Sequence, residues 1–249
     1  MEDRPKLNFM WYLVWENRDI LLKGLWTALS VSVTALALSL VVGLIFALLK
    51  MSRFQVLRGI STLYVNIFRG IPALVSVIWV YFGWSLLFGR NFSVYQAGVI
   101  ALTLLYSSFF SEIFRSALLA IHKGQKEAGF ALGMSRWRIF RSVIMPQALK
   151  IAIPNIGSMF IGMIKDTSTF TVIGLAEVVQ VTQNLNSVYF QPFVFYTAAA
   201  GLYVVVAFAV DFIFRLIESG FTYPKRGTIT RFLTRRRRAH VERLIEINS

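Results

Sequence analysis

The stretch "GLWTALSVSVTALALSLVVGLIFALL", from Gly24 to Leu49, decides the fold class, because none of its side chains is charged. A helix needs about 20 mostly apolar residues to cross the hydrocarbon core of a bilayer. This stretch is long enough to do so. It is therefore predicted to be a membrane-spanning helix.

The composition of the whole chain agrees with this prediction. The 249 residues are 56% hydrophobic and only 15% charged, with a mean hydropathy of +0.62, whereas soluble domains are about 25% charged. The absence of cysteine excludes disulfides, thiolate metal sites and cysteine nucleophiles. The two histidines, His122 and His240, are isolated in the sequence, so no histidine-based metal site is predicted.

Further apolar stretches predict an all-α integral membrane protein with about five spans in one transmembrane domain, residues 24–219. The second stretch is uncharged from Ile71 to Phe88 and has a lead-in from Ile60. The fourth is short and contains Pro154. The predicted spans are 24–49, 60–88, 94–121, 149–164 and 192–217.

The distribution of Lys and Arg predicts the orientation, because these residues collect in cytoplasmic loops. An odd number of spans places the two termini on opposite sides. The segments expected on the cytoplasmic side hold most of the cations. Lys and Arg number three in 50–58, seven in 115–150 and nine from Arg215 onward, against four in 1–23 and one each in 89–93 and 165–191. The N-terminus is therefore predicted outside, and the C-terminus and the 122–146 loop in the cytoplasm.

The two flanking segments are predicted to lie at the membrane surfaces. Residues 1–23 mix aromatic and charged side chains, which is typical of an interfacial helix at the outer surface. Residues 220–249 form a basic tail with "RRRR" at 235–238, which favours an anchor near anionic lipid over RNA binding. The net charge of +14 is explained by the cytoplasmic loops, and no nucleic-acid-binding motif is present.

The loop 122–146 is too polar to cross a bilayer, and its pattern predicts two short helices. Gly133 can end the first helix in the left-handed conformation, and Ser135 can cap the second. Pro146 is expected to break the helical pattern after the loop. Apolar residues recur every three or four positions and form a stripe beside three arginines. The stripe is Phe130, Met134, Trp137, Phe140 and Ile144. It could pack on this chain's own helices or dock into a groove on a soluble partner.

The loop resembles the EAA loop of ABC-importer permeases, whose pattern is E-A-A, three residues, G, nine residues, I-x-L-P. Here the spacing is kept from Glu127-Ala128-Gly129 through Gly133 to Val143 and Pro146, with Gly129 in place of the third alanine. Other stretches resemble the polar amino-acid subfamily of these permeases over residues 20–220. They are "GLWTALSVS", "YVNIFRGIPAL", "SEIFRSALLAIHKGQKEAG" and "PQALKIAIPNIGSMFIGMIKDTSTFTVIGLAEV".

The resemblance implies a permease subunit that forms the pathway for amino-acid uptake in the bacterial inner membrane. Its implied partners are a second permease chain, identical or a sister subunit, two cytoplasmic ATPase subunits and an extracytoplasmic binding protein. The loop would be the coupling helix that contacts an ATPase. By resemblance the contact positions are Glu127, Ala128, Gly129 and Gly133, and the stripe adds Phe130, Met134 and Trp137.

The chain is not predicted to be an enzyme. It has no G-x-x-x-x-G-K-[ST] phosphate loop, so ATP and Mg²⁺ are expected on the partner subunits and no cofactor is expected on this chain. An ATP-independent secondary transporter or channel is the alternative function, since it would need the same spans.

Charged residues inside the predicted spans or directly after them are candidates for the substrate path, because charges at depth face a water-filled path or one another. Glu112 and Arg115 lie three apart on one helix face and are predicted to form a structural pair. Four residues are pathway or substrate candidates, and for Lys165 and Asp166 an intersubunit or outer-gate contact is the alternative role. They are Lys165, Asp166, Ser168 and Asp211.

Overall fold

The computed structural model describes residues 9–89 and 91–221, and all of the regular structure in these ranges is helical. The first half holds α1 (Tyr12–Glu16), α2 (Arg18–Lys50), α3 (Gln55–Gly70), α4 (Ala73–Ile78), the π-helical turn η1 (Trp79–Gly83), α5 (Trp84–Phe88) and α6 (Val94–Leu119). The second half holds α7 (Lys123–Ala131), α8 (Arg136–Ile139), the π-helical turn η2 (Phe140–Ile144), α9 (Met145–Asp166), the 3₁₀ helix η3 (Thr167–Ile173), α10 (Val178–Tyr189) and α11 (Pro192–Phe221).

Four helical runs of the described residues are long and apolar enough to cross a membrane. They are Arg18–Lys50, Val94–Leu119, Arg136–Ile173 and Pro192–Gly220. A fifth candidate is a bent pair, in which Gln55–Gly70 and Ala73–Phe88 meet at 106°. The prediction of an all-α membrane protein with about five spans is confirmed.

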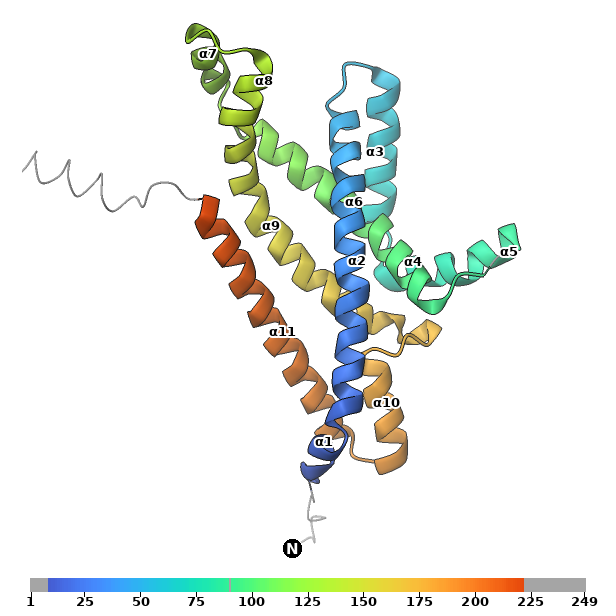
Figure 1. Ribbon diagram of the computed structural model, residues 1–249. Helices are drawn as coiled ribbons and strands as arrows, with labels where there is room; N and C mark the ends of the chain where they lie inside the picture. The colour runs from blue at the N-terminus through green and yellow to red at the C-terminus, as the bar shows by residue number, and fades with distance from the viewer. Residues whose placement is uncertain (1–8, 90, 222–249) are drawn as a thin grey trace, which may run out of the picture.

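The predicted span 60–88 is bent in the structure, and Pro72 explains the break. A proline disfavours helical geometry in the residue before it. Ile71 is extended, with φ −95° and ψ 128°. The arm formed by α4, η1 and α5 therefore turns away from α3 at this point and projects sideways in Figure 1.

Two other boundaries differ from the sequence-based expectation. The first span begins at Arg18 rather than at Gly24, so residues 18–23 of the expected interfacial segment are already part of α2. In the fourth span, α9 runs from Met145 to Asp166 rather than over 149–164, and Pro146 does not interrupt the helical run. Pro146 follows the π-helical turn η2, whose wider spacing accommodates the missing N–H of the ring.

The contact between α2 and α6 is built from small residues, which let two backbones approach closely inside a membrane. Gly43 shows how close the approach is, because a Cβ there would lie 2.9 Å from the carbonyl oxygen of Ser107. The other small residues that α2 buries recur every three or four positions and give one continuous seam. They are Ala28, Ser32, Ala35, Ser39 and Ala47, while Gly24 lies against the backbone of Glu177 and Val178 at the start of α10.

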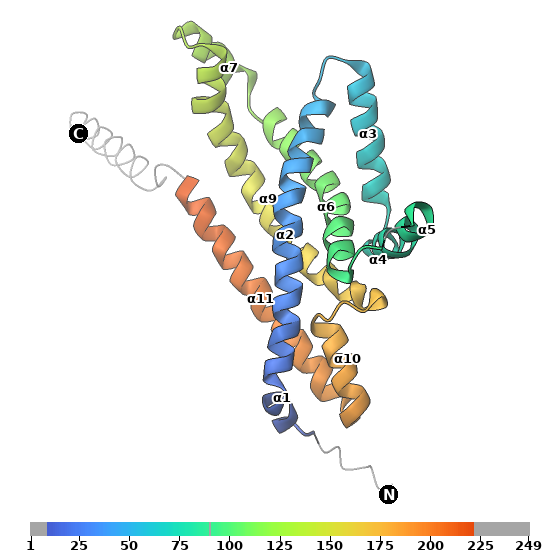
Figure 2. The ribbon, with the colours of Figure 1, turned by 45° about the vertical axis from the view of Figure 1, so that its right-hand side comes forward.

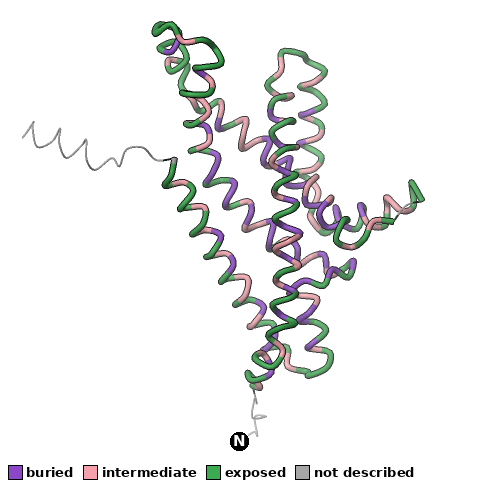
Figure 3. Tube along the Cα trace, in the orientation of Figure 1, coloured by how far each residue is buried: buried purple, intermediate pink, exposed green. Residues whose placement is uncertain are grey.

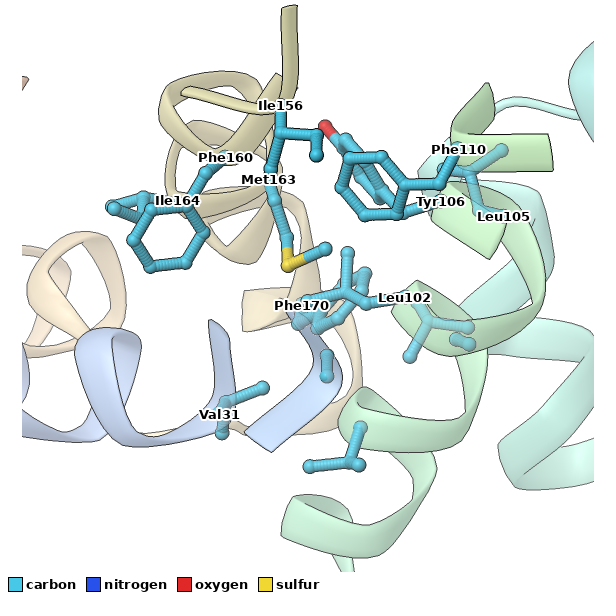
Figure 4. Packing of buried hydrophobic residues seen from close by; sticks show 14 of the residues in the cluster. Val31, Leu102, Leu105, Tyr106, Phe110, Ile156, Phe160, Met163, Ile164 and Phe170 are labelled. Carbon is cyan, nitrogen blue, oxygen red and sulfur yellow. The ribbon is translucent and has the colours of Figure 1, made fainter. Parts of the chain in front are cut away.

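Larger side chains fill the space between α6, α9 and η3. Phe110, Met163 and Phe170 are fully buried there (Figure 4). Phe170 packs over Gly98, where an added Cβ would lie 3.2 Å from its ring. This core fixes the end of α9 against α6 and so determines where the charged residues after Ile164 point.

The molecule has two distinct ends, and Figures 1 and 2 agree on their contents. One end carries α7, α8 and the connection between α2 and α3. The opposite end carries α1, α10 and the beginning of α11. The predicted basic tail lies outside the described residues after Phe221.

Candidate functional site

The loop between α6 and α9 forms the two short helices that the sequence predicted. Gly133 has φ +71°, its N–H donates to the carbonyl of Phe130 at 2.9 Å, and the N–H of Met134 donates to that of Gly129 at 3.0 Å. This pair of hydrogen bonds is the Schellman ending of a helix. The hydroxyl of Ser135 then accepts from the N–H of Arg138 at 3.4 Å and caps α8.

Gly129 fixes the angle between these two helices. A Cβ at this position would lie 2.7 Å from Cγ1 and 2.9 Å from Cδ1 of Ile139. Gly129 and Ile139 are both buried, although the rest of the loop is mainly exposed. The glycine that replaces the third alanine of the motif therefore lets α8 fold tightly onto α7. Its contact within the chain is packing against Ile139.

The exposed surface of the loop combines apolar anchors with cations. Side chains of Phe130, Leu132 and Trp137 are 43%, 80% and 66% exposed, and the loop is mostly green in Figure 3. Five exposed cations surround them. They are Lys123, Lys126, Arg136, Arg138 and Arg141. Met134, Phe140 and Ile144 are only partly exposed, so the predicted stripe is divided between the loop's surface and its own packing.

Glu127 is the only acidic residue of the loop 122–146. It lies on the exposed face of α7 next to Ala128, which is also exposed. Within the described part of the chain, no hydrogen bond or ion pair involves its carboxylate. The carboxylate is therefore available to donors on another molecule.

A second polar site lies between α9 and α11, in a cleft of about 330 Å³. Lys165 from α9 and Asp211 from α11 both line it, together with Tyr203 and apolar side chains. A neighbouring hollow of about 200 Å³ shares Asp211 and extends toward Ser158. The two hollows make a groove that carries charged side chains along an otherwise apolar pair of helices.

Comparison with known proteins identifies the family. Residues 39–223 match the model of the family described as "Binding-protein-dependent transport system inner membrane component". The chain belongs to this family. The resemblance to importer permeases seen in the sequence is therefore confirmed.

The match to individual relatives extends over nearly the whole length of each relative. The chain is 33% identical to the glutamine transport system permease protein GlnP of Escherichia coli K12 over 213 residues, which are 85% of this chain and 97% of that protein. It is 34% identical to the arginine ABC transporter permease protein ArtQ of Haemophilus influenzae, covering 80% and 92% of the two chains. A crystal structure of an amino acid ABC transporter with histidines matches with a TM-score of 0.78 and 31% identity, covering 86% of this chain and 99% of that one.

In this permease, the groove does not gather all four predicted pathway residues. Asp166 points away from Lys165, because the hydroxyl of Tyr106 on α6 donates to its Oδ2 at 2.9 Å. The hydroxyl of Ser168 donates to the carbonyl of Lys165 at 2.7 Å and so closes a turn of the helix. The structure thus places Lys165 and Asp211 in the lining of one cleft, whereas Asp166 is turned toward α6.

The charge of Asp211 is shared with a residue one turn away on α11. Arg215 donates from Nε to Oδ2 of Asp211 at 2.7 Å, and the two side chains are 74% and 46% exposed. Arg215 also lines the smaller hollow. Lys165 has no ion-pair partner within the described residues.

The predicted pair of Glu112 and Arg115 forms, and the structure adds a third member. Arg115 donates to Oε2 of Glu112 from Nη2 at 2.8 Å, while Lys50 at the end of α2 donates to Oε1. All three side chains are mostly buried. The carboxylate therefore ties α6 to α2 beside the loop. Lys50 is 62 residues away in sequence, and no local spacing connects it to Glu112.

Glu177 was missed in the sequence, although a signal was present. It is the only acidic residue between Asp166 and Asp211, and the structure buries it completely. Its carboxyl group accepts a hydrogen bond from the hydroxyl of Tyr203 at 2.6 Å. An isolated acid in a long neutral stretch is the pattern that could have identified it.

Proposed function

We propose that this permease forms the transmembrane pathway of an ATP-driven importer for an amino acid. The observation that carries the proposal is the loop of α7 and α8, which presents Phe130, Leu132 and Trp137 to solvent at one end of the molecule. The names of GlnP and ArtQ and of the related amino acid transporter structure support an amino acid as cargo. The side chain that the transporter prefers is left open.

The loop is proposed to dock in a groove on a cytoplasmic ATPase subunit. Large apolar anchors on short helices suit the helix-in-groove mode of recognition, and the cations around them suit an acidic rim. Glu127 would meet donors on the same partner. In this arrangement Gly129 and Gly133 contribute by shaping the loop, and Phe130 and Trp137 contribute by direct contact.

ATP and Mg²⁺ would bind to two such ATPase subunits, because this chain contains no phosphate loop. A binding protein outside the membrane would deliver the cargo, and a second permease chain, identical or a sister subunit, would complete the pathway. Closure of the ATPases would move the loops and shift the spans between inward-open and outward-open states. The chain itself would hold no cofactor.

The groove between α9 and α11 is proposed to face this pathway. Exposed charges are costly next to lipid, and they normally face water or another protein chain. Lys165 and Arg215 are exposed along this groove, and Asp211 is partly exposed. An ammonium and a carboxylate on opposite helices suit the carboxylate and the ammonium of an amino acid.

The proposal is tested by purifying the tagged chain with its associated proteins from native membranes. We expect a nucleotide-binding subunit to co-purify and the complex, with the binding protein, to take up a radiolabelled amino acid in vesicles only when ATP is present. Uptake that persists without ATP and without an associated ATPase would instead establish the alternative, a secondary transporter or channel.

The proposed orientation, with the N-terminus outside, gives a separate prediction. The chain has no cysteine, so single cysteines can report on sidedness without a background. Gln183→Cys, on the exposed face of α10, is expected to react with a membrane-impermeant maleimide in intact cells. Gln125→Cys, on the exposed face of α7, is expected to react only after the membrane is opened.

These two positions lie at opposite ends of the molecule, so each is the control for the other. The reverse labelling pattern would contradict the orientation and would place the loop outside the cytoplasm.

A further inference from the structure

Glu177 stands out because it is the only fully buried charged side chain among the described residues. No Lys or Arg pairs with it in any of the ion pairs found there. Burying an acidic group without a cation is costly unless hydrogen bonds satisfy it. Its surroundings therefore show what holds it in place.

Three donors from three elements satisfy the carboxyl group. Its Oε1 accepts from the N–H of Gln180 at 2.8 Å, which caps α10, and from the hydroxyl of Thr171 in η3 at 3.1 Å. Its Oε2 accepts from the hydroxyl of Tyr203 in α11 at 2.6 Å. The carboxyl group also lies at the positive end of the helix dipole of α10. Only the Tyr203 bond reaches outside the segment of η3 and α10.

Tyr203 belongs to two sites at once. Its side chain lines the cleft that contains Lys165, while its hydroxyl holds the N-terminus of α10. A shift of α11 beside the cleft would change the distance between this hydroxyl and Glu177. The hydrogen bond is therefore a direct physical link between the cleft and α10.

The segment that carries α10 is set off from its neighbours by a turn at each end. It is bounded by two residues with left-handed backbone, Gly174 at φ +78° and Phe190 at φ +53°. For a residue such as Phe190 this conformation is strained. Such turns are places where the chain direction can change. Val181 and Leu185 of α10 belong to a small cluster separate from the main core, whose other buried members are Leu13, Leu21 and Phe195.

We propose that the hydrogen bond from Tyr203 to Glu177 is a latch that keeps α10 seated beside the cleft until a delivery protein binds. Both are positioning residues, because they act through the placement of α10 and α11 and not through contact with the cargo. The inference rests on the proposed transport function. In the proposed orientation α10 lies at the outer end, where a neutral polar face of Gln183, Asn184 and Ser187 is free to meet a delivery protein.

If the latch exists, removing the hydroxyl of Tyr203 should increase the population in which α10 is released. Tyr203→Phe keeps the ring in the cleft wall but loses the donor to Glu177. The population with α10 released should rise about tenfold, the factor that the loss of one hydrogen bond to an acidic group is worth. Because a delivery protein would otherwise cause this release, ATP hydrolysis by the assembled complex without binding protein should rise by about the same factor.

A cysteine in α10 measures the release independently of ATP hydrolysis. Thr182 is fully buried, and its hydroxyl has no hydrogen-bond partner, so Thr182→Cys should be tolerated. In the purified complex its maleimide reaction is expected to be slow with Tyr203 and about tenfold faster with Tyr203→Phe. Tyr196→Phe is the matched control, since Tyr196 lies on the same helix and its hydroxyl has no partner within the described residues.

Combining the two members of the latch excludes a purely structural effect. Glu177→Gln and Tyr203→Phe together should raise both rates no more than the larger single change, because both remove the same contact. Unchanged labelling and unchanged unstimulated hydrolysis in Tyr203→Phe would overturn the latch. The proposed function itself would fail in a different way, by the absence of any ATPase from the complex with unmodified Tyr203.

Discussion

Glu127→Lys is expected to reduce ATP-driven uptake about 100-fold. The carboxylate would be lost from the interface with the ATPase subunit, and the new lysine would repel the donors that the carboxylate met. Glu127 is exposed on α7, and its carboxylate makes no hydrogen bond within the described residues. The change should therefore leave the fold of the chain intact. It would make every charged residue of the loop 122–146 a cation. Uptake in vesicles and the amount of ATPase that co-purifies with the tagged chain measure the effect.

Gln125→Lys is the matched control for this variant. It also adds a lysine to an exposed position of α7, but residues two apart on a helix are separated by about 200°. It should therefore leave both uptake and co-purification near their normal values. If Glu127→Lys retained full uptake, the carboxylate would not contact the ATPase and docking through this face of α7 would be rejected.

Lys165→Met is expected to reduce uptake about 30-fold while the ATPase stays associated. The variant keeps the length of the side chain and removes the one cation of the cleft between α9 and α11 that has no ion-pair partner in the described part of the chain. A charge-assisted hydrogen bond to a cargo carboxylate is worth about this factor. Initial rates of uptake at saturating binding protein, together with co-purification, give the two quantities to be compared.

Lys150→Met provides the control on the same helix. Lys150 is exposed on α9 but does not line the cleft, so the same chemical change should have little effect there. Normal uptake by Lys165→Met would exclude the cleft as the path of the cargo. Loss of the ATPase from the same variant would instead show that Lys165 acts on assembly. Glu127→Lys and Lys165→Met thus separate docking from passage.

The loop shows how far local sequence carries the prediction. Gly133 and Ser135 determine their own backbone conformations through contacts within a few residues, so the two helices and the turn could be predicted from spacing alone. The role of Gly129 could not. The residue it accommodates, Ile139, lies on the other helix of the loop, and only folding brings the two into contact.

The charged residues in the spans show the opposite case. Lys165 and Asp166 are adjacent in sequence, and the sequence suggested that they act together. Adjacent residues on a helix point about 100° apart, so the packing of α9 decides which neighbour each one meets. Asp166 accepts a hydrogen bond from Tyr106 of α6. Lys165 lines the cleft to which α11 contributes Asp211.

Apolar length and local capping determined, without any tertiary information, that this chain is a helical membrane protein with a two-helix loop. They could do so because lipid solubility and helix ends depend on residues close in sequence. The break before Pro72 also has a local cause, which is the proline itself. The proline alone does not determine the angle of 106° between the two helices. Tertiary structure alone brought Lys50 to Glu112, Tyr203 to Glu177 and Lys165 to the cleft that Asp211 lines, because these contacts join helices distant in sequence. Hydrogen bonds and ion pairs act over a few ångströms in space, and the fold sets those distances.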